Sequence, residues 1–133
     1  MQLLIETDIL HDYLTHTGEE PSVLRQALSR ATCYTTMLNA MEVFALSHST
    51  DERDAVMNML MVVRVLGFSG RYAEGFAELG KRFHTLSQRE LLVAGMASVS
   101  KLTILTERFY DRYAIAGGIA VIRSLEEVPD ESE

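Results

Sequence analysis

Short apolar runs alternate along the chain with longer stretches in which apolar residues recur at helical spacing. The short runs predict buried strands, since polar residues bound them and several are rich in β-branched or aromatic side chains. They are LLI at 3–5, TCYTT at 32–36, VRVLGF at 63–68, LTILT at 102–106 and GIAVI at 118–122. Because helix-length segments separate these runs, we expect βαβ units and an α/β fold.

The longer stretches carry the spacing and end signals of amphipathic helices. The expected helices begin after Thr7 and at Pro21, and further helices span 38–47, 51–61, 70–83 and 87–98. The alternation favours a mainly parallel sheet of roughly five strands with helices on both faces, a three-layer α/β/α arrangement. In such sheets ligands bind beyond the carboxyl ends of the strands. Polar residues that follow the strands are therefore candidate site residues.

The composition fits one domain. The 133 residues are enough for a sizeable core, and they contain no internal repeat or linker. We expect the domain to cover 1–125 and the acidic segment EEVPDESE at 126–133 to be a disordered tail. The single cysteine, Cys33, excludes an internal disulfide framework and is expected in the core. No apolar stretch has membrane length and no signal peptide opens the chain, so we expect a cytoplasmic protein.

Several carboxylates stand where a simple pattern would not place them. Glu6 and Asp8 follow the first strand, Glu42 lies among apolar residues in MLNAMEVFAL, Glu90 opens the run LLVAGMA, and Asp111 follows the fourth strand. Each has a structural alternative. Asp8 suits a helix cap, Glu42 suits a narrow solvent stripe, Glu90 suits the positive end of a helix, and Asp111 suits a turn.

Taken together, these acids predict a metal site. Carboxylates without histidine or cysteine form a hard-oxygen site suited to Mg²⁺ or Mn²⁺, and the four histidines are too dispersed for zinc. A bound cation would also neutralise phosphate. The net charge of −7 argues against broad, unassisted binding of nucleic acid, but it does not exclude a nucleic-acid substrate at a metal site.

The four acidic segments, in their order along the chain, resemble the PIN-domain ribonucleases, and in particular the VapC-type toxins of toxin–antitoxin pairs. LLIETDIL resembles the opening strand and its acid at Glu6, NAMEVFAL carries Glu42, ELLVAGMA begins with Glu90, and TERFYDRY carries Thr106 and Asp111. The closing GGIAVI resembles the final strand of the family. The likeness extends from residue 3 to residue 122 and implies a PIN-like three-layer fold.

The resemblance also implies a function. It implies a ribonuclease in which Glu6, Glu42, Glu90 and Asp111 hold Mg²⁺ or Mn²⁺, and in which Asp8 supports the site. A metal-activated water would then hydrolyse the phosphodiester bond of an RNA substrate. Thr106, at the end of a strand, would orient Asp111 or the water. The resemblance further implies a homodimer and a small antitoxin partner. The lack of an apolar stretch of membrane length predicts no membrane association.

Besides Arg112, which stands in the place of the usual Phe, three positions depart from the family pattern. Glu6 and Glu90 replace the usual Asp, and Arg108 replaces the usual Asn. The longer acids shift the carboxylates outward by one methylene, whereas Mg²⁺ requires near-ideal octahedral geometry. Arg108 has two alternatives: it binds a phosphate, or it pairs with Asp111 or Glu6 in the place of the metal.

These departures support a second hypothesis, a PIN-like module that is catalytically impaired and acts through protein or RNA contacts. A phosphoacceptor receiver domain is a weaker alternative. That fold would need an acid at the end of a central strand, and TCYTT at 32–36 ends without one.

Overall fold

The sheet is built around its N-terminal strand, β1. In the computed structural model, which describes residues 1–128, five parallel strands follow the order β3-β2-β1-β4-β5. Their bounds are Gln2–Ile5 for β1, Thr32–Thr36 for β2, Arg64–Leu66 for β3, Thr103–Leu105 for β4 and Val121–Ile122 for β5. All five coincide with the predicted apolar runs, and the α/β fold is confirmed.

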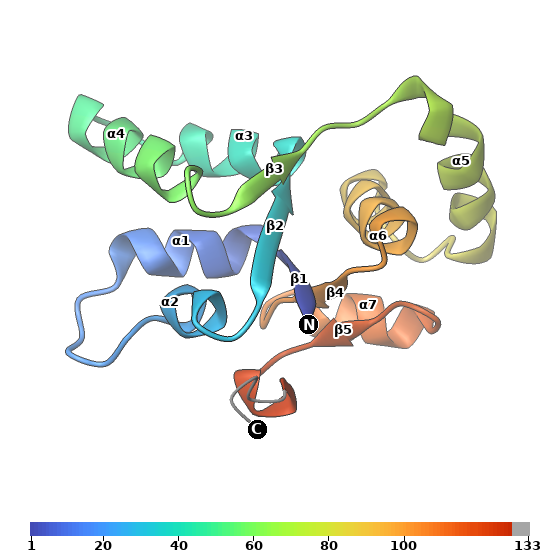
Figure 1. Cartoon of the computed structure of the whole chain (residues 1–133). Helices are drawn as coiled ribbons and strands as arrows, with labels where there is room; N and C mark the ends of the chain where they lie inside the picture. The colour runs from blue at the N-terminus through green and yellow to red at the C-terminus, as the bar shows by residue number, and fades with distance from the viewer. Residues whose placement is uncertain (129–133) are drawn as a thin grey trace.

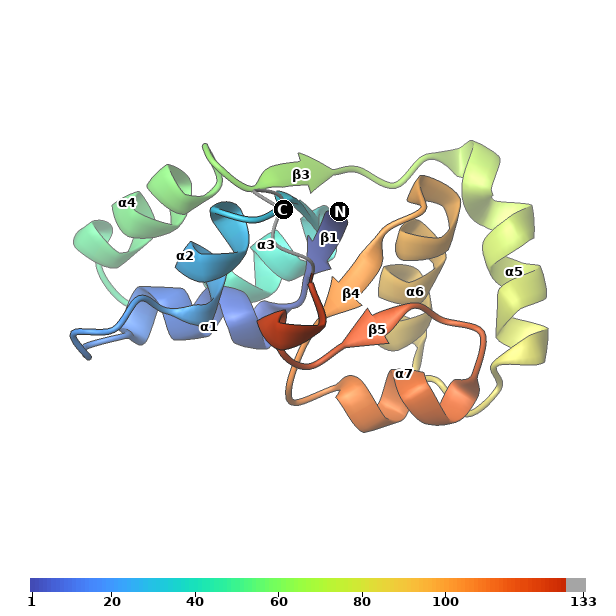
Figure 2. The same cartoon turned by 60° about the horizontal axis from the view of Figure 1, so that its bottom comes forward.

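Seven α-helices cover the sheet within the described residues. They are α1 (Thr7–Thr15), α2 (Val23–Leu28), α3 (Met37–Ala45), α4 (Thr50–Met59), α5 (Ala73–Arg82), α6 (Gln88–Ser100) and α7 (Tyr110–Ala116). Helices α1 to α4 lie on one side of the sheet and α5 to α7 on the other (Figure 1, Figure 2). The three-layer arrangement expected from the alternation is therefore present.

Alternation along β1 divides the core into two halves. Leu3 and Ile5 are fully buried in the cluster under α1, α2 and α4, whereas Leu4 is fully buried in the cluster under α5, α6 and α7. Consecutive side chains of a strand point to opposite faces, so a central strand covered on both sides reads as a continuous apolar run. The apolar run of β1 ends at Ile5, and the charged residue Glu6 follows it directly.

The helix starts explain where the elements begin. Ser22, Thr36, Ser49 and Ser87 each accept a hydrogen bond from a backbone N–H in the first turn of the helix that follows. These side chains satisfy N–H groups that have no partner inside the helix. The predicted helix over 70–83 is divided instead into a 3₁₀ turn at Gly70–Tyr72 and α5.

The folded part continues beyond the expected end of the domain at 125. Residues Leu125–Glu127 form a 3₁₀ turn, and Val128 is buried in the same core cluster as Leu3 and Ile5. The rest of the expected tail, 129–133, lies outside the described residues. Cys33 is buried as expected, and burial raises the pKa of its thiol to about 11. None of the described helices has both the length and the hydropathy needed to cross a bilayer.

Candidate functional site

The candidate site lies at the carboxyl end of the sheet. Glu6 directly follows β1, and β1 has β2 on one side and β4 on the other, so the order of the strands reverses there. Thr36 ends β2, and Thr106 directly follows β4. Such a switch point is where open parallel sheets bind their ligands.

Glu6 is the most buried of the candidate acids. Its side chain has no exposed surface, and its Oε1 caps α1 by accepting the Thr7 backbone N–H at 2.8 Å. Asn39 Nδ2 donates to the same oxygen at 2.7 Å, and the Tyr113 hydroxyl donates to Oε2 at 2.7 Å. The helix cap expected of Asp8 is therefore provided by Glu6, because Glu6 is the last residue before the helix with extended backbone geometry.

Arg89 brings Glu6 and Glu42 together. Its Nη1 and Nη2 donate to the two oxygens of Glu6 at 2.8 and 2.5 Å, and its Nε and Nη2 donate to the two oxygens of Glu42 at 2.7 Å each. Nη2 also contacts Thr7 Oγ1 at 3.1 Å. One guanidinium is thus in bidentate contact with each of two carboxylates, which is the strongest form of this ion pair.

Helix α3 supplies Glu42 and Asn39 from one face. The two residues are three positions apart, so their side chains project in similar directions. Asn39 accepts hydrogen bonds from Thr36 through its Oδ1, and this contact frees its Nδ2 to donate to Glu6. Thr7 Oγ1 donates to Glu42 at 2.6 Å. Glu42 therefore points toward the site and not to a solvent stripe.

Burial and pairing act in opposite directions on the site. Burial by itself would raise the pKa of Glu42, but hydrogen bonds from Arg89 and Thr7 and the charge of Arg89 hold that pKa below its usual value. Burial would lower the pKa of Arg89, and its bonds to Glu6 and Glu42 raise it instead. Burial and the charge of Glu6 raise the pKa of Tyr113. The site therefore holds an ionised guanidinium and a neutral phenol.

An aromatic ring supports the guanidinium. The Arg89 Cζ atom lies 4.4 Å from the centre of the Phe109 ring, within the range of a cation–π contact. Arg108 lies 5.5 Å from the same ring. Arg89 is thus the residue that pairs with Glu6. The sequence analysis had given this pairing as one of the alternatives for Arg108.

Glu90 caps its own helix and pairs with a second arginine. It forms a capping box with Ser87, in which each side chain bonds the backbone N–H of the other at 2.8 and 3.1 Å. Arg112 donates to both Glu90 oxygens, with Nε at 3.0 Å from Oε2 and Nη2 at 2.9 Å from Oε1. The Arg112 pair, ahead of the opposing effect of burial, lowers the pKa of Glu90.

Asp8 organises the loop after β4. Its Oδ1 accepts the Thr106 hydroxyl at 2.9 Å, and its Oδ2 accepts the backbone N–H groups of Glu107 and Arg108 at 3.0 Å each. Thr106 also accepts the Phe109 N–H at 3.1 Å in the turn that precedes α7. Thr106 thus contacts Asp8, where the resemblance had implied Asp111.

Asp111 lies apart from the other acids. Its side chain is 80% exposed and pairs with Arg123 Nη2 at 3.0 Å. Helix α7 directs Tyr113, two positions later, into the core and onto Glu6. The structure therefore gathers Glu6 and Glu42 on Arg89, places Glu90 and Asp8 in contacts of their own, and leaves Asp111 at the surface.

The predicted metal can be tested against these contacts. Within residues 1–128, no three acidic, histidine or cysteine side chains are grouped so that they could hold a metal ion. Mg²⁺ needs carboxylate and water oxygens at about 2.0–2.1 Å in octahedral geometry. The oxygens of Glu6 and Glu42 are directed at a guanidinium instead. In this arrangement the residues do not fit Mg²⁺ or Mn²⁺.

Arg89 is a central residue of the candidate site that the sequence analysis did not identify. Its signal was its position in the first turn of a helix, directly before Glu90, because a cation is unfavourable at the positive end of the helix dipole. An arginine placed there needs an acidic partner from elsewhere in the fold.

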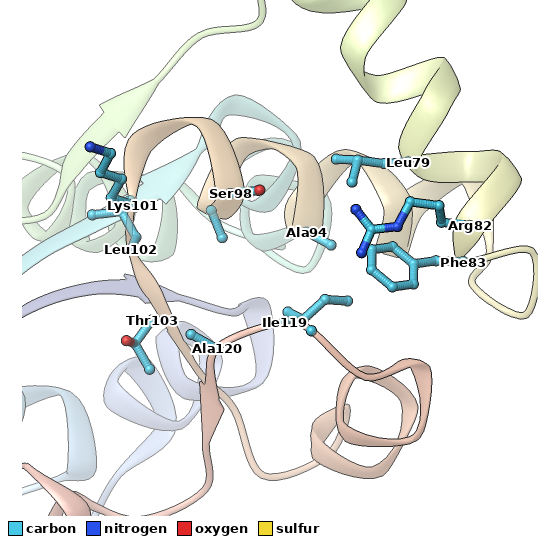
Figure 3. Close-up of a pocket in the computed structure, with 12 residues that line it drawn as sticks. Leu79, Arg82, Phe83, Ala94, Ser98, Lys101, Leu102, Thr103, Ile119 and Ala120 are labelled. Atoms are coloured by element: carbon cyan, nitrogen blue, oxygen red, sulfur yellow. The ribbon is translucent and has the colours of Figure 1, made fainter.

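The structure also holds a cavity of about 320 Å³ away from these acids (Figure 3). It lies between α5, α6 and the segment that leads to β5, beside Arg82, Phe83, Lys101 and Ile119. Thr103 and Ala120 in its lining stand at the amino ends of β4 and β5. The cavity therefore opens at the end of the sheet opposite to Glu6.

Comparison with known proteins identifies solved structures that share this fold. No family model matches the chain, and no curated protein matches it in sequence. Among solved structures, a chain of VapBC2 from Rickettsia felis, bound to a DNA fragment from the promoter, has a TM-score of 0.72 at 13% identity, with 92% of this chain and 98% of that chain covered. The chain shares its PIN-like α/β fold with a chain of this complex.

Two further structures agree with this fold. A toxin–antitoxin complex from Klebsiella pneumoniae has a TM-score of 0.71 at 20% identity, with 90% of this chain and 95% of that chain covered. VapBC-1 from nontypeable Haemophilus influenzae has a TM-score of 0.69 at 11% identity, with coverages of 92% and 97%. The PIN-like fold thus spans nearly the whole chain. These comparisons concern the fold, whereas the carboxylate contacts given above were observed in this chain.

Proposed function

We propose that this chain is a PIN-like protein of the toxin–antitoxin type that acts by binding a partner protein and not by metal-dependent cleavage of RNA. The observation that supports this most is the Arg89 guanidinium between Glu6 and Glu42. It takes up the oxygens that a metal-dependent nuclease would direct at its ion. Glu90 is held in the same way by Arg112.

A cleavage assay tests the catalytic part of this proposal. The purified chain is incubated with single-stranded and structured RNA in Mn²⁺, in Mg²⁺ and in EDTA, beside a Glu42→Gln variant that controls for contaminating nuclease. We expect no cleavage above the level of the variant. Metal-dependent cleavage that Glu42→Gln abolishes would contradict the proposal.

The partner part is supported by the structures that share the fold, which are toxin–antitoxin complexes. We propose a small antitoxin-like protein as the partner of this chain. The test is a search of the DNA beside its gene for a small open reading frame, co-expression of that product with this chain, and then gel filtration and light scattering. A stable complex of the two is expected, and separate elution at micromolar concentrations would contradict this part.

A second candidate is the metal-dependent ribonuclease itself. One observation favours it: Glu6 and Glu42 are close enough to bond the same nitrogen of Arg89, at the carboxyl end of the sheet. In this candidate function, Glu6, Glu42 and Glu90 bind a divalent cation once the Arg89 guanidinium has moved away from Glu6 and Glu42. The cleavage assay decides between the two candidates, since only the nuclease needs added metal.

A homodimer in the cytoplasm is also part of the proposal. Many of the exposed large apolar side chains of the described chain lie between residues 37 and 65. Among them are Met41 on α3, Met57 on α4 and Val65 on β3, elements that lie near one another (Figure 1). Exposed apolar surface of this kind favours association. Sedimentation velocity tests it, with a dimer expected and a monomer at all concentrations as the contradicting result.

A further inference from the structure

We propose that Arg89 is a built-in substitute for a divalent cation, so that this fold carries its own counter-ion and becomes cation-dependent only when the guanidinium is removed. The inference rests on the metal-independent part of the proposed function. It goes beyond that part by assigning the role of the cation to one side chain and by predicting a cation site in a variant.

The charges of the site require a cation. Glu6 is fully buried and Glu42 is partly buried, and both oxygens of each carboxylate bond the Arg89 guanidinium. Two carboxylates held together repel each other, and one of them would take up a proton unless a positive charge stood between them. The lowered pKa of Glu42 agrees with a carboxylate that stays ionised beside Arg89. Arg89 supplies the positive charge from within the chain.

The geometry shows that Arg89 is built into the site. Its Nε, Nη1 and Nη2 atoms all donate to the two acids, and Phe109 lies against its guanidinium. Only 22% of its side chain is exposed. Among the described residues, every buried side-chain nitrogen and oxygen atom has a hydrogen-bond partner. A mobile surface arginine would not satisfy three nitrogens in this way.

Removing the guanidinium would leave a set of oxygens. Glu6 and Glu42 would keep four carboxylate oxygens near the hydroxyl of Thr7, which already bonds Glu42. Uncompensated carboxylates and a hydroxyl are hard ligands of the kind that Mn²⁺ and Mg²⁺ accept. We therefore expect the Arg89→Met variant, which keeps a long apolar stem against Phe109, to gain a response to divalent cations.

The experiment compares melting temperatures of the full chain in EDTA and in about 5 mM MnCl₂. The wild-type protein should melt at the same temperature in both. Arg89→Met should melt about 10 °C or more below wild type in EDTA, since it leaves the buried Glu6 carboxylate with neutral hydrogen-bond donors but without a positive charge beside it. Mn²⁺ should then raise its melting temperature by at least about 3 °C, because an ion that binds only the folded state stabilises it.

Two variants serve as controls. Arg112→Met removes a guanidinium from Glu90, whose oxygens also bond Ser87, and it should show no response to Mn²⁺. The double variant Glu6→Gln with Arg89→Met removes the buried charge as well. It should melt above Arg89→Met in EDTA and should not respond to Mn²⁺. This double variant keeps the test decisive if Arg89→Met is unfolded in EDTA.

Specific outcomes would overturn the inference. They are a rise in the wild-type melting temperature with Mn²⁺, an Arg89→Met variant as stable as wild type in EDTA, and an Arg89→Met variant that Mn²⁺ neither stabilises nor folds. The last two outcomes leave the proposed function standing if the wild-type chain cleaves no RNA. RNA cleavage by wild type would instead remove the proposed function, whatever the variants do.

Discussion

Two arginine–carboxylate pairs in this protein have the same chemistry and very different surroundings. Arg89 holds Glu6 at the carboxyl end of the central strand, where the carboxylate has no exposed surface. Arg123 holds Asp111 on α7, where the two side chains are 53% and 80% exposed. The nitrogen–oxygen distances, 2.5 and 3.0 Å, differ far less than the exposure.

The difference shows that the importance of a pair depends on what happens when one partner is lost. Water can take the place of Arg123 around Asp111, so that pair is expected to contribute little. Water reaches Glu6 poorly, and a buried charge without its partner is costly. The pair between Arg112 and Glu90 lies between these extremes, since Glu90 is 6% exposed and Arg112 is half exposed.

The largest effect is expected from Glu6→Ala. The substitution removes the acceptor of Arg89, Asn39 and Tyr113 together and also removes the cap of α1. We expect a loss of about 3–5 kcal/mol in the free energy of unfolding, measured by urea denaturation. Glu6→Gln, which keeps the size and one carbonyl oxygen, should lose less. No loss for Glu6→Gln beside a large loss for Glu6→Ala would show that the charge of Glu6 does not stabilise the network.

An intermediate effect is expected from Glu90→Ala. It removes the capping box of α6 and the Arg112 pair in one step. Loss of a capping residue typically costs about 1 kcal/mol, and the partly buried pair adds to this, so we expect about 1–2 kcal/mol. Glu90→Gln can keep the bond to the Ser87 N–H and separates the two contributions. A loss as large as that of Glu6→Ala would show that the contacts of Glu90 contribute as much to stability as those of the more buried Glu6.

The fold and the acids differ in how far the sequence predicts them. The strands and the inward position of Glu42 follow from local patterns, because buried strands are apolar runs and an acid surrounded by apolar residues needs an inward partner. The identity of that partner does not follow, since Arg89 lies 47 residues beyond Glu42 and 83 beyond Glu6. Asp111 was expected beside Glu6 because it follows β4, but the turn of α7 directs Tyr113 there instead.

Acid should reduce the stability that the paired acids Glu42 and Glu90 contribute. The pKa values of Glu42 and Glu90 are lowered in the folded protein, so between their unfolded value of about 4.3 and the folded value the unfolded chain binds more protons. Stability from these pairs is fully present above the unfolded pKa and is lost as the pH falls through the folded pKa. Urea denaturation at pH 7, 5, 4 and 3 should show a decline that begins near pH 5.

The double variant Glu42→Gln with Glu90→Gln is the matched control for this decline. Its stability should be lower at pH 7 and should fall less steeply between pH 5 and pH 3, because neither substituted side chain titrates. The same slope in the wild-type protein and the double variant would assign the acid sensitivity to other carboxylates.

The smallest effect is expected from Arg123→Gln, which removes the exposed partner of Asp111. We expect a change within about 0.5 kcal/mol in the free energy of unfolding, because exposed pairs of this kind are largely replaced by hydration. In about 0.5 M salt the change should shrink further, since screening acts on exposed charges first. Arg123 also lies 4.1 Å from the centre of the Tyr110 ring, so a salt-independent loss of more than about 1 kcal/mol would assign its role to that ring contact and not to the ion pair.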